Sequence, residues 1–212
     1  MFDPALFLAF IAAATLLTIT PGVDTAMVLR SAATEGPRSA LFAGIGISIG
    51  CLIWAGAVSL GLGALLQASE LAYTILKWAG AAYLVWLGLK MLIKPRTTWA
   101  DQDTPGAKGF AAMRAGFFTN ITNPKIGVFY VTFLPQFIPH GANVTLYSFF
   151  LALVHIALSV VWFAALTAAT VPLGRALRRP NVIKTLDRVT GGLFIAFGLR
   201  LATSRADRKS VV

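Results

Sequence analysis

Long uncharged stretches, separated by short charged connections, dominate the chain. Residues 4–23 and 39–69 contain no Asp, Glu, Lys or Arg, and neither does the 49-residue stretch 126–174. About 20 apolar residues cross the hydrocarbon core of a bilayer once, so the longest stretch must cross twice. A Pro-His-Gly-Ala-Asn sequence at 139–143 supplies the turn between its two halves. The pattern therefore predicts a multi-pass membrane protein.

We expect an all-α integral membrane protein that forms a single domain, residues 1–212. Its six hydrophobic helical segments are predicted near 5–30, 39–66, 71–93, 115–137, 145–173 and 187–203. The sixth has only 11 uncharged residues, 189–199, and the length rule makes such a segment re-entrant or interfacial.

The charges are distributed unevenly along the chain. It is 57% hydrophobic and only 12% charged, yet its 18 Lys and Arg against 8 Asp and Glu give a net charge of +10. Too little polar surface remains for a soluble nucleic-acid-binding protein. Twelve of the bases fall in the first, third and fifth connections, which predicts that these are cytoplasmic and the N-terminus is outside.

The C-terminal tail conflicts with six crossings. Six would place four bases outside, whereas five would place them inside, in agreement with the rule: Arg200, Arg205, Arg208 and Lys209. By charge alone, five crossings are slightly favoured.

Two charged residues, Asp24 and Lys125, lie within apolar segments. An isolated charge at the centre of a membrane helix costs about 2.5–3.5 kcal/mol on insertion scales, so such residues usually face a cavity or a partner. Each follows a proline, Asp24 after Pro21-Gly22 and Lys125 directly after Pro124. Proline interrupts the helical hydrogen bonds, and interrupted helices line binding sites in many transporters.

The two interruptions also correspond in position. Pro21 lies about 13 Å and Pro124 about 14 Å from the cytoplasmic end of its segment, and the two segments run in opposite directions. This arrangement predicts a 3+3 inverted repeat in which helices 1 and 4 are broken. The alternative is that each proline kink serves packing alone, with Asp24 near the inner interface and Lys125 extending its ammonium to it.

Other residues admit two interpretations. The small-residue face that includes Gly46 and Gly50 favours packing within the chain over dimerisation, and a homodimer is the alternative. His155 is either a packed neutral histidine or a proton relay. Four residues are candidates for lining a pathway or for packing: Tyr83, Trp86, Gln136 and His155.

Several kinds of chemistry have no support in the sequence. There is no glycine-rich phosphate-binding loop, no zinc-binding His-Glu-x-x-His helix and no Gly-x-Ser-x-Gly elbow. Cys51 is the single cysteine and the two histidines lie 15 positions apart, which argues against a metal site. We expect neither an enzyme nor a cofactor.

Short motifs occur in most of the hydrophobic segments. The first contains Thr20-Pro21-Gly22-Val23-Asp24, the fourth contains Asn123-Pro124-Lys125 with 133–137, the third contains the block 80–88, and the second and the last contain glycine clusters. In these motifs the chain resembles the LysE/RhtB family of bacterial amino-acid exporters, although Val23 stands where a second proline is common in the first-segment signature of that family.

The resemblance implies six segments in the bacterial inner (plasma) membrane and favours six crossings over five. It implies a secondary transporter that exports amino acids, driven by the proton motive force. Asp24 would bind the ammonium of the substrate or the coupling proton, and Lys125 its carboxylate. Thr20 and Asn123 would add polar contacts beside the opened backbone. In an equally available interpretation, Asp24 and Lys125 pair while the site is empty.

The sequence leaves two other functions open. The chain could export another small solute or a cation, although it has few carboxylates and no Cys/His cluster. A non-transporting membrane interaction protein would use the glycine face of the second segment and would need no buried charges.

Overall fold

The computed structural model describes residues 2–20, 22–68, 70–95, 108–139, 141–169 and 179–203. Within these ranges the fold is helical and contains no strand, as the sequence predicts. In chain order the elements are α1 (Pro4–Ile19), α2 (Val23–Glu35), α3 (Pro37–Ala68), α4 (Glu70–Ile93), α5 (Phe110–Ile121), α6 (Pro124–Val128), a π-helical turn (Phe129–Phe133), a 3-10 turn (Leu134–Phe137), α7 (Val144–Ala168) and α9 (Pro180–Thr203).

The first hydrophobic segment consists of two helices with an angle of 52° between them, α1 and α2. The Asp3 carboxylate caps the start of α1, accepting hydrogen bonds from the N–H groups of Ala5 and Leu6. The helix stops at an extended residue, Thr20, and α2 starts after another, Gly22. The predicted helix break at Pro21 lies outside the described residues.

The fourth segment is also interrupted. Helix α5 ends at Ile121, and α6 begins at Pro124, the residue after its N-cap Asn123. Proline suits the first turn of a helix because its missing N–H would have no intrahelical acceptor there. The segment continues as the π-helical and 3-10 turns rather than as regular α-helix.

Length and composition identify two helices in the described part as clear membrane-spanning candidates. They are residues 37–61 of α3 and the whole of α7, and the α1–α2 pair would be a third if it forms one bent span. Helix α9 has 24 residues and begins at Pro180, earlier than the hydrophobic pattern alone suggests. The six crossings and the 3+3 inverted repeat remain predictions.

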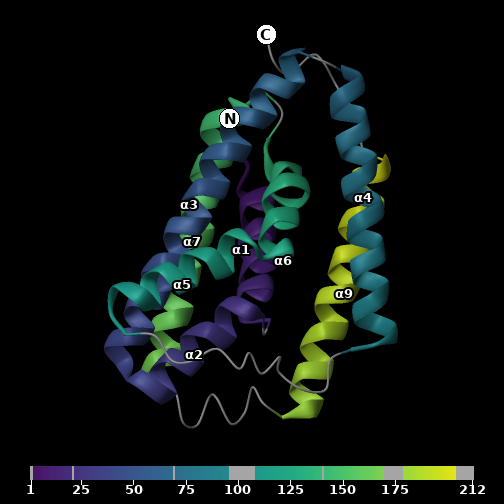
Figure 1. Ribbon diagram of the computed structural model, residues 1–212. Helices are drawn as coiled ribbons and strands as arrows, with labels where there is room; N and C mark the ends of the chain where they lie inside the picture. Colours follow the sequence, from purple (N-terminus) through teal and green to yellow (C-terminus); the bar gives the residue numbers. More distant parts are fainter. Residues whose placement is uncertain are drawn as a thin grey trace.

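Glycines bring two pairs of helices into close contact. A Cβ at Gly46 of α3 would overlap the backbone of Met113 in α5, and one at Gly116 would overlap that of Ala43. Helices α4 and α9 lie side by side (Figure 1), with Gly191 against the backbone of Gly88. The predicted glycine face around Gly46 therefore packs within the chain, against α5.

The buried apolar side chains form two clusters. The larger joins α1 to α3, α4, α7, α9 and the irregular part of the fourth segment, and it is rich in aromatic rings such as Phe10, Phe133 and Phe137. The smaller contains Val28, Leu29, Ala40, Ile47, Phe163 and Leu166, from α2, α3 and α7. The broken part of the first segment lies between these clusters.

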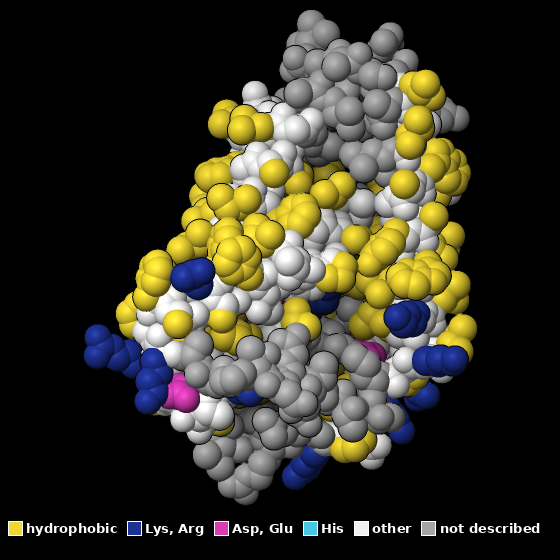
Figure 2. Space-filling model, viewed as in Figure 1, with side chains coloured by type: hydrophobic (Ala, Val, Ile, Leu, Met, Phe, Trp, Pro, Cys, Tyr) yellow, Lys and Arg dark blue, Asp and Glu magenta, His cyan; other side chains and the backbone are white. Residues whose placement is uncertain are grey.

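Lys and Arg side chains gather at one end of the molecule. Figure 2 shows them in the lower half, around the end of α4 and the starts of α5 and α9. Successive long elements run alternately towards and away from this end, so α1 begins and α9 finishes at the opposite end (Figure 1).

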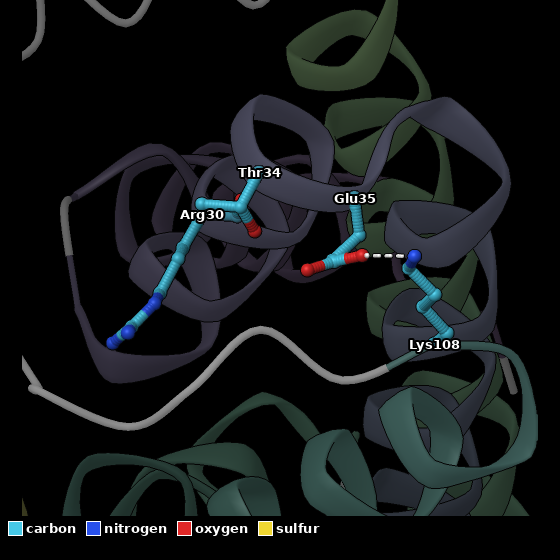
Figure 3. A network of polar contacts seen from close by, with 4 residues as sticks. All are labelled: Arg30, Thr34, Glu35 and Lys108. Atoms are coloured by element: carbon cyan, nitrogen blue, oxygen red, sulfur yellow. Dashed lines mark hydrogen bonds and ion pairs between the residues drawn. The ribbon is translucent and has the colours of Figure 1, made fainter.

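One ion pair at the basic end connects the two broken segments. Lys108 Nζ lies 3.3 Å from Glu35 Oε2 (Figure 3), which links the last residue of α2 to the residue before the N-cap of α5. Lys108 is 81% exposed, and exposed pairs contribute only about 0–1 kcal/mol. The contact therefore joins the end of α2 to the start of α5 but stabilises the fold only weakly.

Candidate functional site

Asp24 lies in the first turn of α2 with 8% of its surface exposed. Its Oδ2 accepts a hydrogen bond of 2.9 Å from the side-chain amide of Asn120 in α5. Within the described residues its Oδ1 is buried and accepts none. A buried carboxylate with one unsatisfied oxygen is costly, so this atom is the place where a proton or a cationic group would bind.

Lys125, in the first turn of α6, extends to the end of α1. Its Nζ donates hydrogen bonds of 3.1 Å to the carbonyl oxygens of Leu17 and Thr20. The last carbonyls of a helix have no partner in that helix and carry partial negative charge, so an ammonium stabilises them. The break in the first segment is thus held by a residue from the break in the fourth.

Gly22 provides the space that the Lys125 ammonium occupies. A Cβ built at position 22 would lie 3.2 Å from Lys125 Nζ and 3.5 Å from its Cε. The backbone at Gly22 is extended, a conformation open to any residue. A larger residue at this position would therefore press on the Lys125 ammonium, whereas the backbone angles do not call for glycine.

Asn120 belongs to the site although the sequence analysis did not select it. It is fully buried, and its amide donates to Cys51 Sγ at 3.4 Å as well as to Asp24. Gly50 leaves space for it, since a Cβ there would lie 2.5 Å from Asn120 Oδ1. An amide in an uncharged segment, five residues before Lys125, was the signal available in the sequence.

A small cavity connects these groups. Asp24, Lys125, Cys51 and His155 line it, together with apolar and hydroxyl side chains from α1, α2, α3, α6 and α7. The volume open to the centre of a water molecule is 20 Å³. This is enough for about one water molecule and far too little for an amino acid, so the cavity must widen before an amino acid can bind.

Asp24 and Lys125 contribute to the same cavity from the two broken segments. Lys125 Nζ donates to the α1 carbonyls, and Asp24 accepts from Asn120. The pairing of the two charges in the empty site stays a prediction.

His155, one of the four pathway or packing candidates, does reach the cavity. It is buried in α7, and its Nδ1 lies 3.1 Å from the Tyr130 hydroxyl. Its ring also packs 4.8 Å from that of Phe129. The structure places His155 beside Asp24 and Lys125, but the contact with Tyr130 is equally compatible with a packed neutral ring.

Thr20 and Asn123, predicted as polar ligands, make structural contacts at the two breaks. The Thr20 hydroxyl shares a hydrogen bond of 2.6 Å with the Thr190 hydroxyl of α9. The Asn123 side chain accepts a hydrogen bond from the Lys125 backbone N–H, and its own amide nitrogen has no partner among the described residues. Neither side chain lines the cavity.

The remaining candidates lie away from the cavity. Trp86 is 54% exposed on α4, with Lys90 Nζ 5.3 Å from its ring centre and Tyr83 packed beside it. Gln136, in the 3-10 turn, donates to the carbonyl of Thr132. The described residues contain no cluster of three or more His, Cys, Asp or Glu suited to a metal ion.

The contact between Gly50 and Asn120 allows a specific test. We expect Gly50→Ala to displace the Asn120 amide from Asp24 and to lower transport about tenfold, the effect of losing about 1.4 kcal/mol from a charge-assisted hydrogen bond. Gly56→Ala, on the same helix, is the control because a Cβ there meets no atom within 4 Å. Equal transport by the two variants, each compared at matched membrane levels, would contradict the role of Asn120.

A polar centre between two interrupted helices is typical of one class of helical membrane transporters. A model of the LysE type translocator family matches residues 15–205, and the chain belongs to this family. The resemblance seen in the sequence is thereby confirmed. The chain is an integral protein of the bacterial inner membrane.

Curated relatives match along almost their whole length. An uncharacterized membrane protein of Vibrio cholerae is 32% identical over 96% of this chain and 100% of its own. A homoserine/homoserine lactone efflux protein of Salmonella typhimurium is 32% identical, covering 93% of this chain and 96% of the relative. A leucine efflux protein of Klebsiella pneumoniae is 28% identical, with 93% and 94% covered. No solved structure matches the chain.

Proposed function

We propose that this translocator exports amino acids from the cytoplasm in exchange for protons. The observation that carries the proposal is the small cavity to which each broken segment contributes one charge, Asp24 from α2 and Lys125 from α6. The names of the relatives, efflux proteins for homoserine and for leucine, support the same class of substrate.

The two charges are complementary to the two charges that every amino acid carries. The ammonium group fits Asp24 Oδ1, which accepts no hydrogen bond among the described residues. The carboxylate fits Lys125 and the start of α2, whose N-cap residue, Gly22, has no side chain to cap the first-turn N–H groups. Uncapped helix N-termini bind anions in transporters with broken helices.

The packing of the helices supports six crossings arranged as a 3+3 inverted repeat. Helix α2 contacts α5, α3 contacts α7, and α4 contacts α9, so each segment of the first half touches the corresponding segment of the second, although α3 packs most extensively on α5. The alternating direction of the long elements and the gathering of bases at one end agree with this topology.

The two apolar clusters act as the gates of an alternating-access cycle. The cluster around Val28, Ile47 and Phe163 separates the cavity from the basic, cytoplasmic end, and the larger aromatic cluster separates it from the opposite end. Opening towards the cytoplasm separates fewer side chains. An amino acid then enters, and its binding replaces a proton at Asp24.

The test uses the full chain in proteoliposomes preloaded with labelled leucine and homoserine. We expect efflux to accelerate when the side opposite the substrate is made acidic, because protons then move inward as the substrate leaves. An efflux rate that is the same with and without the pH gradient would contradict proton coupling. Absence of efflux of any amino acid would remove export itself.

A further inference from the structure

Helix α9 contacts both gates and the break in the first segment. Its buried residues lie along one face, and Thr190, near the middle of that face, is fully buried. We propose that Thr190 is a positioning residue that couples the α4–α9 pair to the substrate site through Thr20, so that the pair moves as one body when the two gates open in turn. This inference rests on the proposed export function and names the part of the fold that moves.

Helices α4 and α9 are packed backbone against backbone. A Cβ at Gly191 would lie 2.7 Å from the carbonyl oxygen of Gly88, and one at Gly198 would lie 3.0 Å from that of Ala81. Small residues thus allow the two helices to approach closely at two levels. Among the described elements, α4 packs most extensively on α9, and the two helices stand side by side (Figure 1). A movement of one helix must therefore carry the other with it.

Side chains of α9 on either side of Thr190 reach the two gates. Leu186 packs on the smaller apolar cluster, which lies towards the basic end. Phe194 and Phe197 pack in the larger cluster, where the ring centre of Phe197 lies 4.2 Å from that of Phe133. Leu186 and Phe194 each lie four residues from Thr190, which is about 6 Å along the helix axis. A rotation of α9 about Thr190 would therefore open one gate as it tightens the other, a rigid-body movement suited to alternating access.

A buried hydrogen bond fixes this pivot to the break in the first segment. The Thr190 hydroxyl lies 2.6 Å from the Thr20 hydroxyl, and both residues are fully buried. The Thr20 hydroxyl donates its own hydrogen to the carbonyl of Leu16, so Thr190 is the donor between the two. Because Thr20 is the C-cap of α1, the bond joins α9 to the point at which the first segment is interrupted.

Thr20 also connects the pivot to the substrate site. Its carbonyl oxygen accepts a hydrogen bond of 3.1 Å from Lys125 Nζ. A carboxylate is a stronger acceptor for an ammonium than a carbonyl is, so a substrate that binds Lys125 competes with Thr20 for it. Weakening this bond loosens the backbone at Thr20, and the hydroxyl of the same residue transmits the change to Thr190. Occupancy of the site thus reaches α9 through a short chain of hydrogen bonds.

The first experiment replaces Thr190 by valine, which keeps the branched shape and removes the hydroxyl. Equilibrium binding of labelled leucine to the full chain in detergent counts the folded sites, and leucine exchange in proteoliposomes is expressed per site. We expect Thr190→Val to bind leucine with unchanged affinity and to exchange it about tenfold more slowly, roughly the effect of one hydrogen bond. Thr190→Ser, which keeps the hydroxyl, should restore the rate, and Thr185→Val, at an exposed position of the same helix, should leave it unchanged.

An unchanged rate per site in Thr190→Val protein would overturn the inference while leaving export intact. A loss of folded sites alone, with the same rate at each remaining site, would show a purely structural role and would overturn it as well. Exchange of no amino acid by the unmodified protein would instead overturn the proposed function.

A second experiment tests whether α9 closes both gates, and it does not depend on Thr190 variants. Cys51 is the single cysteine and lines the cavity, so a membrane-impermeant methanethiosulfonate added to vesicles of either orientation reports which gate opens. We expect Leu186→Ala to accelerate modification about tenfold from the cytoplasmic side only, and Phe197→Ala from the opposite side only, because each removes a large apolar side chain from one gate. Leu199→Ala is the control, since Leu199 is 57% exposed on the same helix. Equal acceleration from both sides, or acceleration by neither variant, would contradict the assignment of α9 to the two gates.

Discussion

Asp24→Asn is expected to abolish export driven by a pH gradient, lowering the rate at least about 100-fold, while the protein inserts and folds normally. The substitution keeps the shape of the side chain and an oxygen for the Asn120 amide. It removes the only acid among the described residues that line the cavity. Because a buried carboxylate with one oxygen that accepts no hydrogen bond among the described residues destabilises the folded protein, the melting temperature in detergent should stay equal or rise.

Two transport assays on this variant separate the possible roles of Asp24. If the carboxylate binds only the coupling proton, exchange of internal for external amino acid should persist in Asp24→Asn protein although driven efflux is lost. If it binds the ammonium group, both activities should fall together. Driven efflux within threefold of the unmodified protein would exclude Asp24 from either role.

Lys125→Met should be the second most damaging change, with export reduced about 100-fold and stability lowered as well. The variant removes the cation that would bind the substrate carboxylate. It also leaves the Leu17 and Thr20 carbonyls without their donor, and a buried unsatisfied polar group costs about 1–3 kcal/mol. Stability should therefore separate the two residues, falling for Lys125→Met and not for Asp24→Asn.

Matched substitutions test whether charge or position matters at Lys125. Lys90→Met removes a lysine of α4 that lies over the exposed ring of Trp86, outside the cavity, and should transport normally. Lys125→Arg keeps the charge, but the guanidinium is larger than the space left by Gly22, so export should be intermediate. Export by Lys125→Met at the level of Lys90→Met would contradict the assignment.

Part of this site could be predicted from the sequence because a charge within a membrane segment is energetically costly. Asp24 and Lys125 stood out as charges within apolar segments, and the prolines before them marked interruptions at similar depth. Thr20 and Asn123 were selected because they flank those prolines. Their side chains contact Thr190 and the backbone of Lys125, and their role as substrate ligands stays a prediction. Adjacency in sequence to a break does not determine the direction in which a short side chain points.

Asn120 and Gly50 show why the rest needed the fold. An amide in an apolar segment is inexpensive compared with a charge, and a glycine in a membrane helix is common, so neither stands out in a single sequence. Their importance arises from the close packing of α3 on α5, which places the Asn120 amide against Asp24. The exposed position of Trp86 on α4 could not be predicted from the sequence pattern either.

By itself, the sequence determined that this protein is helical and embedded in a membrane, that its family is the LysE type translocators, and that two charges lie where charges are costly. The membrane character and the cost of the two charges follow from composition and local order, because the free energy of inserting each residue into a bilayer depends on its own polarity. The family follows from the short motifs in the segments. Only the tertiary structure decided that Asp24 and Lys125 line one cavity. It also decided that Asn120, Gly22 and the α1 carbonyls hold them there, because contacts between distant segments depend on how the helices pack.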